Sequence, residues 1–152
     1  MKKSGLICLL VILFFGHYCY SQPEHRHSIA LAAGAVYLSD DKVVDPGVHL
    51  EYAYHFMLGK ILLNSGSSIE MIFGEERHIG LALYMGYSPL KGWDVGLGPG
   101  VMFEGDTHYY CINISTSYGF DMGSFSLGPA MELAHTGKHF HFLMGLHIEL
   151  DF

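Results

Sequence analysis

The sequence predicts an all-β fold, an eight-stranded antiparallel up-and-down barrel that crosses a membrane and is preceded by a signal peptide. Three observations support this prediction. Apolar residues recur with a period of two along most of the chain, turn residues separate the alternating segments, and no ten-residue segment beyond the N-terminal region has a helical period. The 152 residues have the length of one domain.

The N-terminal segment has the layout of a secretory signal peptide. Lys2 and Lys3 precede an apolar run over residues 6–15, and small residues follow this run. The run is shorter than the roughly 20 apolar residues that span a bilayer as a helix. We therefore expect it to direct export rather than to anchor the chain.

The cleavage site is expected after residue 21. Cys19 and Ser21 then supply the small residues at positions −3 and −1. This divides the chain into a signal peptide over residues 1–21 and a barrel domain over residues 22–152. Attachment to lipid through Cys19 is the alternative, which the bulky Tyr18 before it disfavours.

The charge of the chain argues against a nucleic-acid partner, and its cysteine content argues against an internal disulfide. Removal of Lys2 and Lys3 leaves 6 of the 8 basic residues against 15 acidic residues, so the mature chain has a net charge of −9. We expect no nucleic-acid partner, because binding to phosphates requires basic surface. Of the 3 cysteines only Cys111 follows the predicted cleavage site, so the mature barrel cannot form an internal disulfide.

Eight alternating segments are predicted as strands. In chain order they cover residues 27–38, 48–56, 59–73, 77–88, 92–104, 107–121, 124–135 and 138–152. The joints between them read SDDKVVDPG, MLG, GEE, PLKG, EGDT, DMGS and TGK. Short joints of this composition favour hairpins between neighbouring strands, so the chain is expected to form an antiparallel meander.

The two faces of the predicted strands differ in a way that sets their orientation. In chain order, one face is apolar: Ile29, Leu31, Tyr37, Leu50, Tyr52, Tyr54, Phe56, Ile69, Met71, Phe73, Ile79, Leu81, Leu83, Trp93, Val95, Leu97, Tyr110, Ile112, Ile114, Tyr118, Phe120, Phe125, Leu127, Met131 and Leu133. The opposite face is small: Ala30, Ala32, Gly34, Gly80, Ala82, Gly86, Gly96, Gly98, Gly100, Ser115, Ser117, Gly119, Ser126, Gly128, Ala130 and Ala134. Glycine on a water-facing strand weakens it, whereas the crowded interior of a narrow barrel requires small residues. The small face is therefore expected inside and the apolar face against lipid.

Aromatic residues support the same orientation, because they lie near strand ends as in the interfacial girdles of membrane barrels. They are Tyr37, Tyr54, Phe56, Phe73, Tyr87, Trp93, Phe103, Tyr110, Tyr118, Phe120, Phe125, Phe140 and Phe152. The alternative is a soluble, lipocalin-like barrel with these aromatics in its core. Such a barrel would need many charged residues on the opposite face, where few Lys or Arg occur.

The last segment shows the alternation most clearly. Even positions from Phe140 to Phe152 are all apolar, whereas the odd positions are mostly polar or small. The even side is therefore expected against lipid. Three histidines and two acids on the odd side are expected in the lumen: His139, His141, His147, Glu149 and Asp151.

These features together resemble small bacterial outer-membrane barrels of the OmpA/OmpX type, and the SQ junction is similar to those of Bacteroidetes envelope proteins. The resemblance covers residues 22–152 and implies a Gram-negative outer-membrane location with lipid as the surrounding partner. In that family the barrel-assembly machinery reads the last strand, which implies this role for Ile148, Leu150 and Phe152. The usual glycine of that signal is out of register, because His147 takes its place and Gly145 lies two residues earlier.

The sequence assigns no catalytic or cofactor-binding residue. A lipid-modifying enzyme would need a lipid-facing serine beside a histidine, but the nearest hydroxyls to His135 and His108 are those of Thr136 and Thr107. A porin-like conductance is expected to be small, because side chains fill the lumen of an eight-stranded barrel. We therefore expect a monomeric barrel with a structural or interaction role, no enzyme activity and no cofactor.

The alternative function is binding of a transition metal or another small cation in the lumen. If both termini are periplasmic, inward histidines and acids gather in the outer half: His49, Glu51, Glu70, His78, Glu104, Glu132, His139 and His141. The candidate ligands are His49, His78, His139, His141 and Glu132, because imidazole with carboxylate suits such ions. The competing interpretation is that these groups only satisfy one another, since a narrow lumen cannot leave a charge unpaired.

Overall fold

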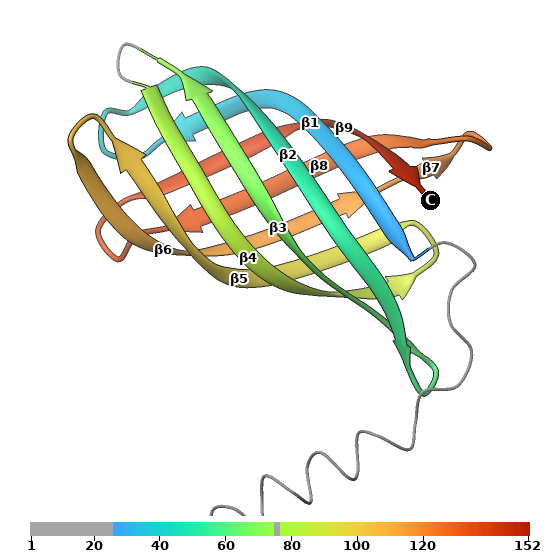
Figure 1. The fold of residues 1–152 in the computed structure, drawn as a ribbon. Helices are drawn as coiled ribbons and strands as arrows, with labels where there is room; N and C mark the ends of the chain where they lie inside the picture. The colour runs from blue at the N-terminus through green and yellow to red at the C-terminus, as the bar shows by residue number, and fades with distance from the viewer. Residues whose placement is uncertain (1–25, 75–76) are drawn as a thin grey trace, which may run out of the picture.

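A computed structural model describes residues 26–74 and 77–152 as an all-β structure (Figure 1). The predicted signal peptide and its cleavage site lie outside the described residues. The strands are β1 (His27–Leu38), β2 (Val43–Leu58), β3 (Ile61–Phe73), β4 (Arg77–Leu90), β5 (Trp93–Glu104), β6 (Thr107–Tyr118), β7 (Phe120–Asp121), β8 (Ser126–His135) and β9 (Phe140–Asp151). In this part of the chain no helix is long and apolar enough to cross a bilayer.

The strands close into a barrel in the predicted antiparallel order. Apart from β6 and β7, which do not pair with each other, each strand pairs with its sequence neighbours, and β1 pairs with β9 to form the seam. Strands β6 and β7 both pair with β8 and are separated only by Gly119, whose N–H donates to the carbonyl of Gly92 at 2.7 Å. They are two parts of one wall segment, so the prediction of an eight-segment barrel is confirmed.

The two ends of the barrel are named here by the chain termini. The terminal end is the one where β1 begins and β9 ends, and the β2–β3, β4–β5 and β7–β8 turns share it (Figure 1). His27 and Phe152 tie this end of the seam through reciprocal backbone hydrogen bonds of 3.0 and 2.8 Å. The other four turns lie at the opposite end.

The predicted start of the second strand is wrong by five residues. Strand β2 begins at Val43, which pairs with Leu38, so only residues 39–42 form the first turn. The DPG sequence looks like a turn, but Pro46 pairs with Ala35 inside the ladder. A strand accepts proline where its nitrogen is not needed as a donor. This longer strand moves His49 away from the opposite end.

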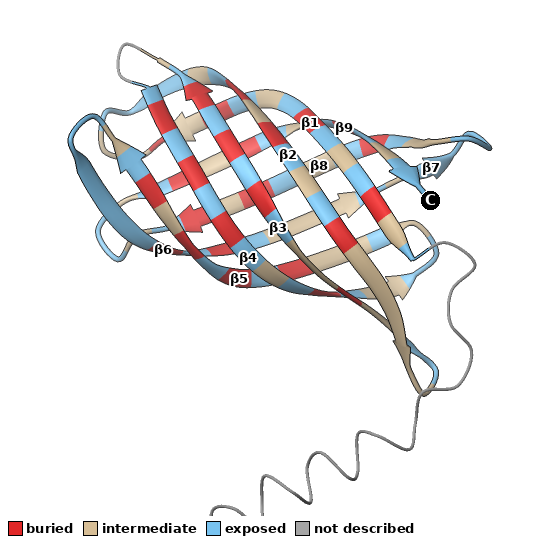
Figure 2. Ribbon diagram, in the orientation of Figure 1, coloured by how far each residue is buried: buried red, intermediate tan, exposed pale blue. Residues whose placement is uncertain are grey.

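Burial alternates along each strand and is inverted relative to a soluble protein (Figure 2). Leu83 is 65% exposed and Leu146 62% exposed, whereas Glu70 is 5% and His78 2% exposed. Buried polar residues include Ser28, His49, Asn64, Ser68, Asn113, Glu132, His141 and His147. The predicted orientation, with the apolar face outward and the polar and small face inward, is confirmed.

Exposed aromatic residues form a belt near each end of the wall. The terminal end carries Tyr52, Tyr87, Trp93, Tyr118, Phe120 and Phe152, and the opposite end carries Phe73, Phe103, Tyr110 and Phe140. Between the belts the exposed face is aliphatic, with residues such as Leu31, Leu81, Leu97 and Leu146. This distribution is the one found where a barrel wall meets two lipid–water interfaces.

Small residues make room in the lumen for large ones. A Cβ placed on Gly66 would lie 2.6 Å from the Tyr84 hydroxyl, and one on Gly96 would lie 3.5 Å from the same ring. Tyr84 therefore fills the space that these two glycines leave. Toward the opposite end, four apolar side chains meet inside the barrel: Val36, Leu38, Ile72 and Leu143.

Candidate functional site: the polar lumen

The lumen holds acids and imidazoles without lysine or arginine. Every Lys and Arg among residues 26–74 and 77–152 is exposed, at a turn or near a strand end. Buried or half-buried acids nevertheless occur at seven inward strand positions: Asp45, Glu51, Glu70, Asp94, Glu104, Glu132 and Glu149. Their counter-charges and donors must therefore come from histidine, hydroxyl and amide groups, or from a bound cation.

The middle of the lumen is organised around His49 of β2. Its Nδ1 forms an ion pair with Glu132 of β8, and its Nε2 lies 3.6 Å from Glu51. Glu70 stands opposite His49 in the β2–β3 register. The imidazole thus faces three carboxylates from three strands. This cluster agrees with the interpretation that buried acids and imidazoles satisfy one another.

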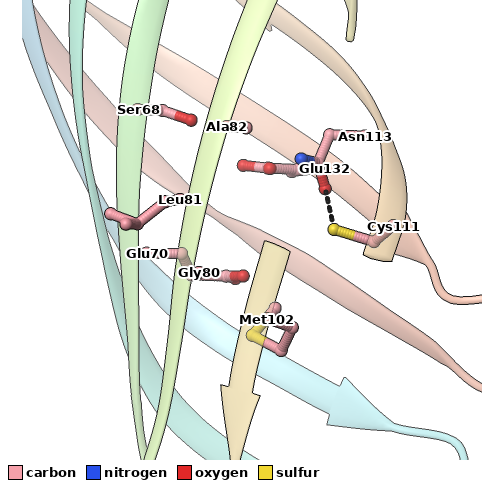
Figure 3. Close-up of a pocket in the computed structure, with 9 residues that line it drawn as sticks. All are labelled: Ser68, Glu70, Gly80, Leu81, Ala82, Met102, Cys111, Asn113 and Glu132. Atoms are coloured by element: carbon pink, nitrogen blue, oxygen red, sulfur yellow. Dashed lines mark hydrogen bonds between the residues drawn. The ribbon is translucent and has the colours of Figure 1, made fainter. Parts of the chain in front are cut away.

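A small cavity lies beside this cluster (Figure 3). Glu70 and Glu132 line it together with Asn113, whose Oδ1 accepts from the Cys111 thiol at 3.7 Å. Its volume of ≈ 10 Å³ corresponds to about one water molecule. This cavity therefore has no room for an organic ligand.

Toward the terminal end, the acids have hydroxyl and amide donors. The Tyr84 hydroxyl donates to Glu51 at 2.6 Å, and the Asn64 amide donates to Asp94 at 3.1 Å. The Ser88 hydroxyl also donates to Asp94. One set of bonds joins β2 to β4 and the other joins β3, β4 and β5; together they are the polar network of this half of the lumen.

The terminal mouth contains a second group of polar residues. Ser28 hydrogen-bonds His55 with an Oγ–Nε2 distance of 2.9 Å, and His55 Nε2 lies 4.0 Å from Glu149. The other oxygen of Glu149 lies 3.7 Å from His147 Nε2. Asp151 completes the group, and neither His55 nor Asp151 was among the predicted metal ligands. The sequence signal for this polar group was the recurrence of polar residues at positions 147, 149 and 151.

The opposite end contains a pair of buried histidines. The rings of His78 and His141 meet edge to face with centroids 5.3 Å apart, and His78 Nε2 lies 3.7 Å from Glu104. Within the described part of the chain, both Nδ1 atoms are buried without a hydrogen-bond partner, and so is Oδ1 of Asp40 in the β1–β2 turn at the same end. An imidazole nitrogen left without a partner inside a protein is costly, so the two Nδ1 atoms are unsatisfied positions of this region.

The predicted metal ligands do not form one belt. His49 meets Glu132 in the middle of the lumen, and His78 meets His141 toward the opposite end. The two pairs do not include His139, which precedes β9 and whose carbonyl accepts from Thr136 within the hairpin. Because β2 starts early, His49 lies six residues beyond the first residue of its strand, Val43, and not at the strand end as predicted.

The histidines considered for lipid chemistry lie on the outer wall. His135 and His108 are exposed, as their parity predicted, and neither has a hydroxyl partner in the part of the chain that the structure describes. The Thr107 and Thr136 hydroxyls instead donate to the backbone carbonyls of Glu104 and His139. These residues therefore do not form a paired nucleophile and base.

Neither the family models nor the curated proteins contain a match to this sequence. Among solved structures, the chain is similar to one described as "De novo design of transmembrane beta-barrels", with a TM-score of 0.55 and 10% identity. The alignment covers 86% of this chain and 100% of the designed one. At this identity the likeness concerns the fold alone, which is that of a closed barrel of the transmembrane type.

Proposed function

We propose that this protein is a small integral outer-membrane barrel with a structural or interaction role and a lumen filled by side chains. The observation that supports this most directly is the inverted wall, apolar outside and polar inside. Lipid would cover the exposed aliphatic band, and barrel closure would satisfy the backbone donors and acceptors within hydrocarbon. The signal-peptide pattern provides the route of export, and closure without a free sheet edge favours a monomer.

Membrane insertion is tested by fractionation and gel mobility. Protein expressed with its native N-terminus should appear in the outer-membrane fraction, and unheated samples should migrate differently from boiled ones because the barrel stays folded. The refolded protein should also resist protease in lipid vesicles. Recovery as a folded protein in the soluble periplasmic fraction would refute the proposal.

The lipid-facing assignment is tested by Leu146→Arg. Leu146 lies on the outward face of β9 between the two aromatic belts. A charge there should cost roughly 2–4 kcal/mol of unfolding free energy in vesicles, because arginine near the midplane must leave water. Asp106→Arg, in the exposed turn between β5 and β6, is the control and should change stability little. Equal effects of the two substitutions would contradict a lipid-facing Leu146.

Assembly through the last strand is tested by removal of Phe152. Ile148, Leu150 and Phe152 all project outward at the terminal end, and Phe152 stacks on His27 with ring centroids 5.7 Å apart. Deletion of Phe152 should lower the amount of assembled barrel far more than Asp106→Ala does. The amount is measured by the heat-dependent gel shift of membrane samples. Equal amounts would argue against recognition of this strand by the assembly machinery.

Metal binding in the lumen is the second candidate function, and the unpartnered Nδ1 atoms of His78 and His141 favour it. Calorimetric titration of tag-free refolded protein with Zn²⁺, Cu²⁺ and Ni²⁺ tests this. Submicromolar binding that is lost in the double variant His78→Ala/His141→Ala would support a luminal site. Unchanged binding in that variant would leave the pair as interior packing.

A further inference from the structure

The three inward strand ends at the terminal mouth bring ligand-type side chains together. Ser28 of β1 pairs with Ala53 of β2 on one side and with Asp151 of β9 on the other. Strand β1 therefore lies between His55 of β2 and the two acids of β9, Glu149 and Asp151. One ligand atom from each of these three residues lies within 4.8 Å of the other two.

We propose that His55, Glu149 and Asp151 bind a divalent transition-metal ion at the terminal mouth of the barrel. Ligands held at about 2.0–2.2 Å from one ion lie at most about 4.4 Å apart. The three ligand atoms lie within 4.8 Å of one another, and His55 Nε2 is 4.0 Å from Glu149, so a small rotation of the side chains can close the set without moving a strand.

The donor set indicates the class of ion. One imidazole nitrogen with two carboxylates suits Zn²⁺, Co²⁺ or Ni²⁺, whereas Mg²⁺ and Ca²⁺ prefer oxygen ligands alone. A +2 ion would also balance two neighbouring carboxylates. The protein supplies three ligands in this arrangement, and water completes the coordination.

The residues around the three ligands already orient them. Glu149 has one oxygen 3.7 Å from His147 Nε2 and the other 4.0 Å from His55 Nε2. A carboxylate held on one oxygen presents the other, as supporting residues do in metal sites. Ser28, 2% exposed, holds the imidazole with Nε2 toward the acids, and a bound ion would replace this hydroxyl as the partner of Nε2.

Access distinguishes this site from the clusters deeper in the barrel. His55 and Glu149 are half-buried and Asp151 is exposed, so a hydrated ion can reach them from the mouth. His49 and Glu132 are both buried beside a cavity of ≈ 10 Å³. The site also spans the seam, since its ligands come from the two strands that flank β1. A bound ion would therefore link β2 to β9 and so hold the first and last strands of the barrel wall together.

Zn²⁺ calorimetry and Co²⁺ absorption on refolded, tag-free barrel test this proposal. The unaltered protein should bind one ion at micromolar concentration or tighter, and Zn²⁺ should raise the unfolding midpoint. His55→Ala and Asp151→Asn should each weaken binding at least 10-fold and abolish the rise in midpoint. Asp151→Asn keeps the shape of an exposed side chain and provides the test if His55→Ala does not fold.

Two control variants make the outcome specific. His108→Ala removes an exposed imidazole at the opposite end and should leave Zn²⁺ affinity unchanged. His78→Ala/His141→Ala tests the deeper histidine pair: loss of all binding in that variant would assign the ion to the lumen and overturn this proposal, and retained binding would support the site at the mouth. Absence of binding, or equal affinity in His55→Ala and the unaltered protein, would overturn it as well. The gel shift, measured without metal, reports barrel formation independently of these results.

Discussion

The two halves of the lumen are filled by different kinds of contact. Toward the terminal end, the carboxylates of Glu51 and Asp94 accept hydrogen bonds from Tyr84, Asn64 and Ser88. Toward the opposite end, an apolar cluster of Val36, Leu38, Ile72 and Leu143 occupies the interior beside the His78–His141 pair. The comparison shows that the lumen of one narrow barrel can be filled by a polar network at one level and by hydrophobic packing at another.

This difference follows from which residues share a level in the register. Val36 pairs with Leu143 across the β1–β9 seam, whereas Ala30 pairs with Glu149 on the same two strands. A small residue opposite an acid leaves space for donors from other strands to reach it. Two large apolar residues opposite each other fill the same width and exclude water.

The largest expected effect is on the apolar cluster. Leu143→Ala should lower the unfolding free energy by about 2–5 kcal/mol, because it leaves a cavity among buried side chains. Leu146→Ala on the same strand faces outward and should cost less, since lipid can fill the vacated space. Denaturant unfolding of the two variants in vesicles measures the difference. Equal losses would show that the cluster does not behave as a core.

An intermediate effect is expected in the polar network. Tyr84→Phe removes the 2.6 Å donor to Glu51 and should cost about 1–3 kcal/mol, because it leaves an oxygen of this half-buried carboxylate without that bond. Tyr110→Phe, at a side chain that is 77% exposed, is the matched control. The unfolding midpoint should fall only for Tyr84→Phe. A neutral result there would mean that solvent or another donor satisfies Glu51.

The smallest effect is expected at the terminal rim. Lys91 donates to Asp121 at 3.1 Å between two exposed side chains. Lys91→Ala should leave the unfolding midpoint unchanged within measurement error, because water and salt screen such pairs. A clear loss of stability would show that the β4–β5 and β7–β8 turns depend on this contact, and that polar contacts matter equally inside and outside the lumen.

The orientation of the wall could be predicted because it depends on residue type and parity alone. Apolar residues such as Leu31 and Leu83 alternate with small ones such as Ala32 and Ala82, and lipid contact is compatible with only one assignment of the two faces. The period of two fixes the face of each residue in a strand once the strand is recognised. The number of wall segments followed from the spacing of the turns.

The heights of the inward residues could not be predicted in the same way. Asp45, Pro46 and Gly47 have the composition of a turn, and only pairing with β1 shows that they belong to a strand. An error of five residues at one strand end shifts every inward side chain of that strand along the barrel. His49 was therefore expected next to the strand end but lies six residues beyond Val43, where it meets Glu132, another of the predicted ligands.

By itself, the sequence determined the all-β class, the antiparallel meander and the face on which each histidine and acid lies, because these depend on local periodicity and turn composition. Only the tertiary structure decided which of them meet. His55 and Glu149 are 94 positions apart in the chain and lie near each other because β1 pairs with both β2 and β9. Closure and strand register set such contacts, and both are properties of the whole barrel.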